Sequence, residues 1–221
     1  MKLTRFILLC GVTALTGITN QVQAKPVAST STAAVNAGTV QTQDSPKAPV
    51  AILYQALNTI QQRNSGTFEQ QDALLKKALI SAYDFSTILS NTVGYRYNTL
   101  TPADKESLMT AFVNYTTARY ISSFAGDTNS KFTIDAKVKP ASVGDDKIVS
   151  TTIGDKQDPT TISYLVRRTP TGWKIIDVLL NGHISQVAVQ HNDFNSTLSQ
   201  GGSTALVDML NKKTQSFSSK K

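Results

Sequence analysis

The segment Gly172–Leu180 (GWKIIDVLL) constrains the fold most, because it has the character of a β-strand that is apolar on both faces. Successive side chains of a strand point to opposite faces. The predicted sets are Trp173, Ile175 and Leu179 on one face and Ile176, Val178 and Leu180 on the other. A sheet with one solvated face would show a polar residue at every second position. We therefore expect this strand to be covered twice, by helices or by a molecule that fills a cavity.

Residues 1–24 are predicted to be a secretory signal peptide. They combine a basic start, an apolar core at residues 6–18 and a small-residue cleavage site, Val-Gln-Ala, at residues 22–24. The apolar core is shorter than the roughly 20 residues that span a bilayer. We therefore expect an exported, soluble mature protein.

Composition limits the chemistry and the partners of the mature chain. Cys10 is the only cysteine, so its loss with the signal peptide excludes disulfide and thiol chemistry. Lys2 and Arg5 leave as well, which lowers the formal net charge from +7 to +5. The remaining charge is scattered, whereas nucleic-acid binding needs a clustered basic stripe interleaved with aromatic residues. We therefore expect no nucleic-acid partner.

The chain divides into a linker, one domain and a short tail. Residues 25–48 are rich in Ala, Ser, Thr, Gln and Pro and lack aromatic residues, which predicts a disordered linker. Residues 49–217 are long enough to bury a core of their own, and they are predicted to form a single domain. Residues 218–221 form a basic tail.

Helical periodicity predicts four helices in the first half of the domain. Pro49 is suited to open the first helix, and Thr67 with Gln70 forms a capping box for the second. The third is predicted over residues 84–92. The fourth and longest is predicted to begin at the Thr101-Pro102 pair and to run to about residue 124.

After Gly126 the apolar period changes from 3.6 to 2, which predicts strands. The predicted strands lie near residues 132–138, 148–153, 162–166 and 172–180. Short turns join them into a four-stranded antiparallel meander. Two final helices are predicted at about residues 185–198 and 203–217, separated by Gly201-Gly202. Helices, then strands, then helices again predict an α+β fold.

Residues with catalytic potential are few. The mature sequence has two histidines and no H-E-x-x-H, G-x-S-x-G, P-loop or dinucleotide motif. The nearest approach to a catalytic pair is Asp177 with His183, which would act as acid and base on an apolar substrate. In the alternative, Asp177 accepts hydrogen bonds from the backbone or from Arg168, and His183 is a surface residue of the turn.

Several segments resemble the MlaC family of periplasmic phospholipid-binding proteins, also called the toluene-tolerance family. They are YDF at residues 83–85, VGYRY at 93–97, TPADKESLMTAFVNYTTARY at 101–120, and GWKIIDVLLNG at 172–182 followed by VAVQHNDF at 187–194. Their order and spacing extend the resemblance over residues 49–217.

Two departures are similar to the hopanoid-associated branch of this family, HpnM. Residues 182–185 (Gly-His-Ile-Ser) hold one residue more than the family's Gly-Val-Ser. Residues 190–194 (Gln-His-Asn-Asp-Phe) replace its Tyr-Arg-Ser-x-Phe pattern. This similarity implies a hopanoid-related lipid as an alternative cargo to a phospholipid.

The resemblance implies a carrier without catalytic activity or cofactor. It would shuttle lipid through the periplasm between an outer-membrane lipoprotein complex and an inner-membrane ABC transporter complex, with acyl chains in an apolar cavity between the sheet and the helices. The residues predicted to contact lipid are Phe85, Tyr95, Leu108, Phe112, Tyr115, Ile134, Tyr164, Val166, Ile175, Leu179 and Val187. A pure interaction module, in which the aromatic residues only form a core, is a further alternative.

Overall fold

Five helical segments precede the sheet: the four helices that the sequence predicted and, between the third and the fourth, a 3-10 helix that it did not predict. The computed structural model describes residues 44–126, 129–154 and 159–218, so the predicted signal peptide and most of the predicted linker lie outside the described residues. The helices are α2 (Ala48–Ile60), α3 (Phe68–Ala82), α4 (Phe85–Val93), the 3-10 helix η1 (Gly94–Thr99) and α5 (Pro102–Phe124). Within the described residues, no helix is both long and apolar enough to cross a membrane.

Side-chain caps fix where the longer helices begin. Thr67 and Gln70 form the predicted capping box of α3, with each side chain bonded to the backbone N–H of the other residue. The Thr101 hydroxyl accepts a hydrogen bond from the Asp104 N–H at 3.1 Å and donates one to the Asp104 carboxylate at 2.7 Å. Such caps satisfy backbone N–H groups that have no partner inside the helix.

The sheet is an antiparallel meander with the order β1-β2-β3-β4-β5. Its strands are β1 (Phe132–Pro140), β2 (Lys147–Ile153), β3 (Thr160–Thr169), β4 (Gly172–Leu180) and β5 (Ile184–Ser185). The sequence predicted four strands, and the fifth is a two-residue addition. It forms because Asn181 and Gly182 take positive φ values of 51° and 78°, which turn the chain back against the end of β4.

A β-bulge in β4 changes which of its residues face the helices. Leu165 of β3 pairs with Asp177 and Val166 pairs with Ile175, so Ile176 is an extra residue without a partner. Strict alternation, as predicted from the sequence, is therefore wrong at this point: Ile175 shares the helix-facing side with Val178 and Leu180, whose partners Tyr164 and Ile162 are also in the core. Leu179 lies on the other side.

The second face of the sheet is covered unevenly, since Ser163 on this face is buried. Leu165 and Leu179, which do not face the helices, are only half-buried, and the neighbouring Ser150 and Ser163 are joined by a 3.2 Å hydrogen bond between their hydroxyls.

The C-terminal helix α6 (Gln186–Ser218) contains the predicted break at the two glycines. Gly201 and Gly202 have non-helical backbone angles, and Gly202 has a φ of +65°, which favours glycine. The helix therefore has two separate halves, residues 186–200 and 203–218.

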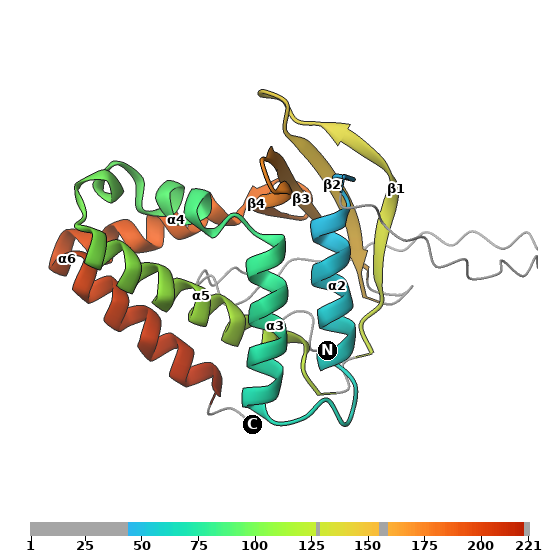
Figure 1. Cartoon of the computed structure of the whole chain (residues 1–221), viewed down its shortest axis with the longest axis horizontal. Helices are drawn as coiled ribbons and strands as arrows, with labels where there is room; N and C mark the ends of the chain where they lie inside the picture. Colours follow the sequence, from blue (N-terminus) through green and yellow to red (C-terminus); the bar gives the residue numbers. More distant parts are fainter. Residues whose placement is uncertain (1–43, 127–128, 155–158, 219–221) are drawn as a thin grey trace, which may run out of the picture.

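The core lies between the sheet and the helices. Figure 1 shows the sheet on one side of the molecule, α2 and α3 beside it, and α4, α5 and α6 grouped on the other side. The largest fully buried side chains include Tyr164 on the sheet and Phe112 on α5. Tyr54 of α2 shares a 2.6 Å hydrogen bond with Thr151 of β2 across this core. Among the described residues, no buried side-chain nitrogen or oxygen lacks a hydrogen-bond partner.

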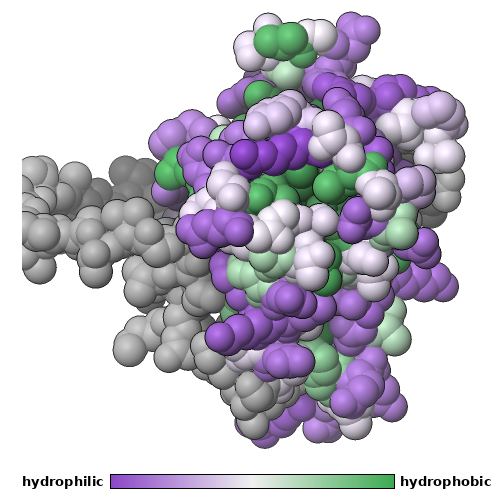
Figure 2. Space-filling model, turned by 90° about the vertical axis from the view of Figure 1, so that its left-hand side faces the viewer, coloured by the Kyte–Doolittle hydropathy of each residue, from purple (hydrophilic) through white to green (hydrophobic). Residues whose placement is uncertain are grey.

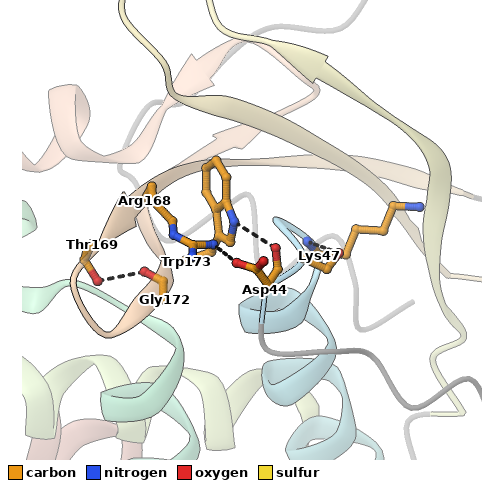
Figure 3. Close-up of polar contacts among 7 residues, drawn as sticks. Asp44, Lys47, Arg168, Thr169, Gly172 and Trp173 are labelled. Atoms are coloured by element: carbon orange, nitrogen blue, oxygen red, sulfur yellow. Dashed lines mark hydrogen bonds and ion pairs between the residues drawn. The ribbon is translucent and has the colours of Figure 1, made fainter.

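Asp44 fixes the start of the described chain to the β3–β4 hairpin. Its carboxylate forms an ion pair with Arg168, and its carbonyl accepts a hydrogen bond from the Trp173 indole at 3.2 Å (Figure 3). The Arg168 guanidinium lies 5.8 Å from the centre of the Trp173 ring. Asp44, which lies before Pro49, the predicted start of the domain, thus contacts the sheet, and α2 itself begins at Ala48.

We expect Thr101→Ala to lower the free energy of unfolding by about 1 kcal/mol, because it removes the cap of α5, the longest continuous helix before the sheet. Urea unfolding measures the change. Thr204→Ala, at an exposed position of α6, is the matched control. Equal stability of the two variants would contradict the capping role of Thr101.

Candidate functional site

An apolar pocket lies where β4 meets α4, α5 and the first half of α6. Its volume is about 60 Å³. The lining residues are Tyr83, Phe85, Ile88, Phe112, Thr116, Arg119, Tyr120, Asp177, Val178, Gln186, Val187 and Gln190. The four aromatic members and Ile88 are buried, whereas Arg119, Asp177 and Gln190 are only half-buried. The pocket therefore has an apolar interior and polar side chains toward solvent.

Aromatic rings form the interior wall of the pocket. The Phe85 ring stacks on Tyr83 with a centroid distance of 5.5 Å, and its edge meets the Phe112 ring at 5.9 Å. Phe112 in turn makes an edge contact with Phe194 of α6 at 6.1 Å. Offset and edge-on contacts of this kind are the favoured arrangements of aromatic pairs.

Two tyrosine hydroxyls meet beside this aromatic wall. The hydroxyls of Tyr83 and Tyr120 are 2.6 Å apart and share a hydrogen bond. Burial raises the pKa of both phenols above its usual value, because a buried phenolate would lose its hydration. Both groups therefore stay neutral, and their mutual hydrogen bond satisfies them inside an apolar environment.

Asp177 connects the sheet to the start of α6. One carboxylate oxygen accepts a hydrogen bond from the Ser185 hydroxyl at 2.6 Å, and the other accepts from the N–H of Val187 at 3.2 Å. The Ser185 hydroxyl also accepts from the Ala188 N–H at 3.0 Å. Asp177 and Ser185 thus share the capping of α6, and a carboxylate is well placed at a helix N-terminus.

The structure does not bring His183 to Asp177. His183 is exposed, and its Nδ1 lies 2.8 Å from the carbonyl of Asn181 in its own turn. Both oxygens of the Asp177 carboxylate are used in the contacts to α6, and Arg168 pairs with Asp44 instead. In the described part of the chain, no three His, Cys, Asp or Glu side chains are grouped so that they would hold a metal ion.

Polar contacts join α4 and η1 to the first half of α6. Nδ1 of His191 lies 3.0 Å from the carbonyl oxygen of Thr92, and the Arg96 guanidinium donates to the side chains of Asn195 at 2.8 Å and Ser199 at 3.1 Å. Gly94 permits this close approach, since a Cβ atom there would lie 2.8 Å from the His191 ring.

The structure places the predicted lipid-contact residues in different surroundings. Phe85, Phe112 and Val187 line the pocket. The residues Leu108, Tyr115, Tyr164, Val166 and Ile175 are buried in the core outside the lining. Ile134 is half-buried against the core, and Leu179 lies on the opposite face of the sheet because of the bulge in β4. Tyr95 is 75% exposed on η1.

None of the remaining lining residues is among the predicted lipid contacts. On α5, Phe112, Thr116 and Arg119 are spaced so that they share one face of the helix. From the predicted Phe112, this spacing points to the other two. Ile88 lies three residues after Phe85 on α4, and Gln190 three residues after Val187 on α6. These signals were present in the sequence. Tyr83 lies in a connection between helices, where spacing gives no such signal.

The surface over α4, α5 and α6 is mostly polar. Figure 2 shows this side of the molecule, with apolar side chains visible near the middle of the face and surrounded by polar ones. The apolar interior described above is thus largely, but not completely, enclosed by polar residues on this side.

We expect Asp177→Ala to lower the free energy of unfolding by about 1–2 kcal/mol, because hydrogen bonds to a charged acceptor contribute more than neutral ones. The amides of Val187 and Ala188 should exchange hydrogen faster, which mass spectrometry measures. Asp193→Ala, an exposed carboxylate of the same helix, is the control. Unchanged exchange at the start of α6 would refute the capping role.

Comparison with known proteins identifies the family. The family model described as MlaC protein matches residues 47–212. A solved structure with a similar fold is that of a phospholipid-binding protein from Ralstonia solanacearum, determined in complex with a phospholipid. It has a TM-score of 0.67 and 21% sequence identity, and the alignment covers 78% of this chain and 98% of that chain. A search of curated proteins found no match. Because the family match spans well over half of the chain, the protein belongs to the MlaC family.

Proposed function

We propose that this protein is a periplasmic lipid carrier that shuttles phospholipid, or a hopanoid-related lipid, between the outer and inner membranes as part of an ABC-transport pathway. The observation that carries the proposal is the apolar pocket between β4 and the helices α4, α5 and α6, in a chain of the MlaC family. The phospholipid bound by the Ralstonia protein of similar fold supports a lipid as the ligand.

A carrier explains the site better than an enzyme does. Asp177, the one carboxylate of the lining, is held by the start of α6, and His183 lies in an exposed turn away from it. The buried part of the lining consists mainly of aromatic and aliphatic side chains. Such a surface binds apolar groups, and the hydroxyls of its two buried tyrosines are bonded to each other.

The energetics of lipid transfer require an interior site. Each buried methylene contributes about 0.8 kcal/mol, so two acyl chains of about 15 methylenes each contribute roughly 24 kcal/mol. A carrier that crosses water has to recover most of this free energy by burying the acyl chains in its own interior. A volume of 60 Å³ holds only about four to six groups of the size of a water molecule. Lipid binding therefore requires the walls of the pocket to move apart.

The first half of α6 is the wall best suited to move. It lies between two non-helical points, the turn at residues 181–183 and the break at Gly201-Gly202. Its contacts to α4 and η1 include the polar ones of His191 and Arg96, which water can replace. We infer that this half-helix swings outward to admit acyl chains.

The partners follow from the same proposal. An inner-membrane ABC transporter complex and an outer-membrane lipoprotein complex would deliver and accept the lipid. Contacts with either complex would be transient, because the carrier has to release both in turn.

Lipid extraction and mass spectrometry of protein purified from cells test the proposal. We expect co-purified phospholipid or hopanoid-related lipid in the wild type. Val187→Phe, which fills the pocket from α6, should lower the lipid content roughly tenfold. Val189→Phe is the matched control, because Val189 lies two residues further on the same helix and does not line the pocket.

Two results would defeat the proposal. One is a wild-type protein that is free of lipid in repeated preparations and takes up none from phospholipid vesicles. The other is a Val187→Phe variant that is folded and carries as much lipid as Val189→Phe.

A further inference from the structure

A second hollow lies directly behind the aromatic wall of the pocket. It is more open to solvent and has a volume of about 460 Å³. It is lined by Ile80, Tyr83, Asp84, Phe85, Ser86, Met109, Val113, Thr169, Thr171 and Lys174. Its apolar members come from the end of α3 and from α5, and its polar members lie mainly on the β3–β4 hairpin and at the start of α4. Ile80 is 55% exposed there.

The pocket and the hollow share two residues, Tyr83 and Phe85. The stacked rings of these residues therefore form the partition between the two spaces. Phe112 borders the pocket on one side of this partition, whereas Met109 and Val113, its neighbours on α5, border the hollow. The same stretch of α5 thus lines both spaces.

The two rings of the partition are held very differently. Tyr83 is fixed by its hydroxyl bond to Tyr120, and its backbone forms a bridge with Ile175 of β4. The Phe85 ring has no polar atom and is held only by apolar contacts, among them those to Tyr83 and Phe112. A rotamer change of Phe85 therefore breaks no hydrogen bond, and Phe85 is the part of the partition that can move.

We propose that the hollow is a binding site for the terminal part of an acyl chain whose first part lies in the pocket, and that Phe85 is the gate between them. This inference rests on the proposed function. Two observations indicate an acyl chain as the occupant. The hollow adjoins the pocket through a partition of only two rings, and Ile80, Met109 and Val113 give it apolar side chains. In the hollow, beside Ile80, there is room for the part of the chain that the pocket is too small to hold.

Photocrosslinking to lipid chains tests the proposal on the full chain as cells produce it. The probe is palmitoyl phosphatidylglycerol with a diazirine at the end of the palmitoyl chain, and a second probe carries the diazirine near the ester. Mass spectrometry locates the labelled residues. We expect the terminal diazirine to label Ile80, Met109 or Val113, and the ester-side diazirine to label only the pocket.

The outcomes separate this inference from the function on which it rests. Labelling by the terminal diazirine that is confined to pocket residues such as Phe112 and Val187 would overturn the hollow as a chain site and leave the carrier function standing. Absence of labelling by both probes, together with lipid-free protein, would overturn the carrier function itself.

A charge in the hollow gives an independent test. Ile80→Glu should weaken binding of dipalmitoyl phosphatidylglycerol by roughly tenfold, because an apolar chain end would meet a carboxylate. Binding of the dioctanoyl lipid, whose chains end in the pocket, should not change. Leu74→Glu is the matched control, since Leu74 is exposed on the same helix and lines neither space. Equal binding of the long-chain lipid by both variants would overturn the proposal.

Discussion

Two of the three helices around the pocket, α4 and α6, have their first turns anchored to one strand, β4, and the geometry of the site depends on this. The N–H of Asp84 donates to the carbonyl of Ile175 at 2.9 Å, and the Asp84 side chain then caps α4 through the N–H of Thr87 at 3.0 Å. Two residues further along β4, the Asp177 carboxylate caps α6. The starts of the two helices are thus fixed close together, and a shift of β4 would displace both.

The bulge at Ile176 makes this arrangement possible. Strict alternation would place Ile175 and Asp177 on the same face, so that a carboxylate would enter the core beside Val166 or Ile175 would leave it. The extra residue separates them: Ile175 packs opposite Val166 in the core, and Asp177 pairs with Leu165 and reaches the start of α6. Burial of an unpaired carboxylate is costly, and bulges often redirect a side chain in this way near functional sites.

Periodicity and caps in the sequence predicted the helices, the meander and the break in α6, because each of these depends on residues that are near one another in the chain. The bulge left no such signal, since the adjacent Ile175 and Ile176 suit either face. The partition of the pocket was also not predictable, because the contact of Tyr83 with Tyr120 joins residues that are 37 positions apart in the chain. Sequence spacing identified Phe85, Phe112 and Val187 as lining residues, but it could not distinguish them from buried residues such as Leu108 and Val166.

The contacts around the pocket differ in what their loss would cost, and this difference sets the direction of opening. Separation of α4 from β4 would break the bridge at Ile175 and expose the buried rings of Tyr83 and Phe85 to water. Separation of the first half of α6 from α4 and η1 would break the polar contacts of His191 and Arg96, whose groups regain hydrogen bonds to water. It would also uncover the buried side chains of Phe194 and Leu198. Because water can replace these polar contacts, we propose that the pocket opens on the side of α6 while Tyr83 and its junction with β4 stay in place.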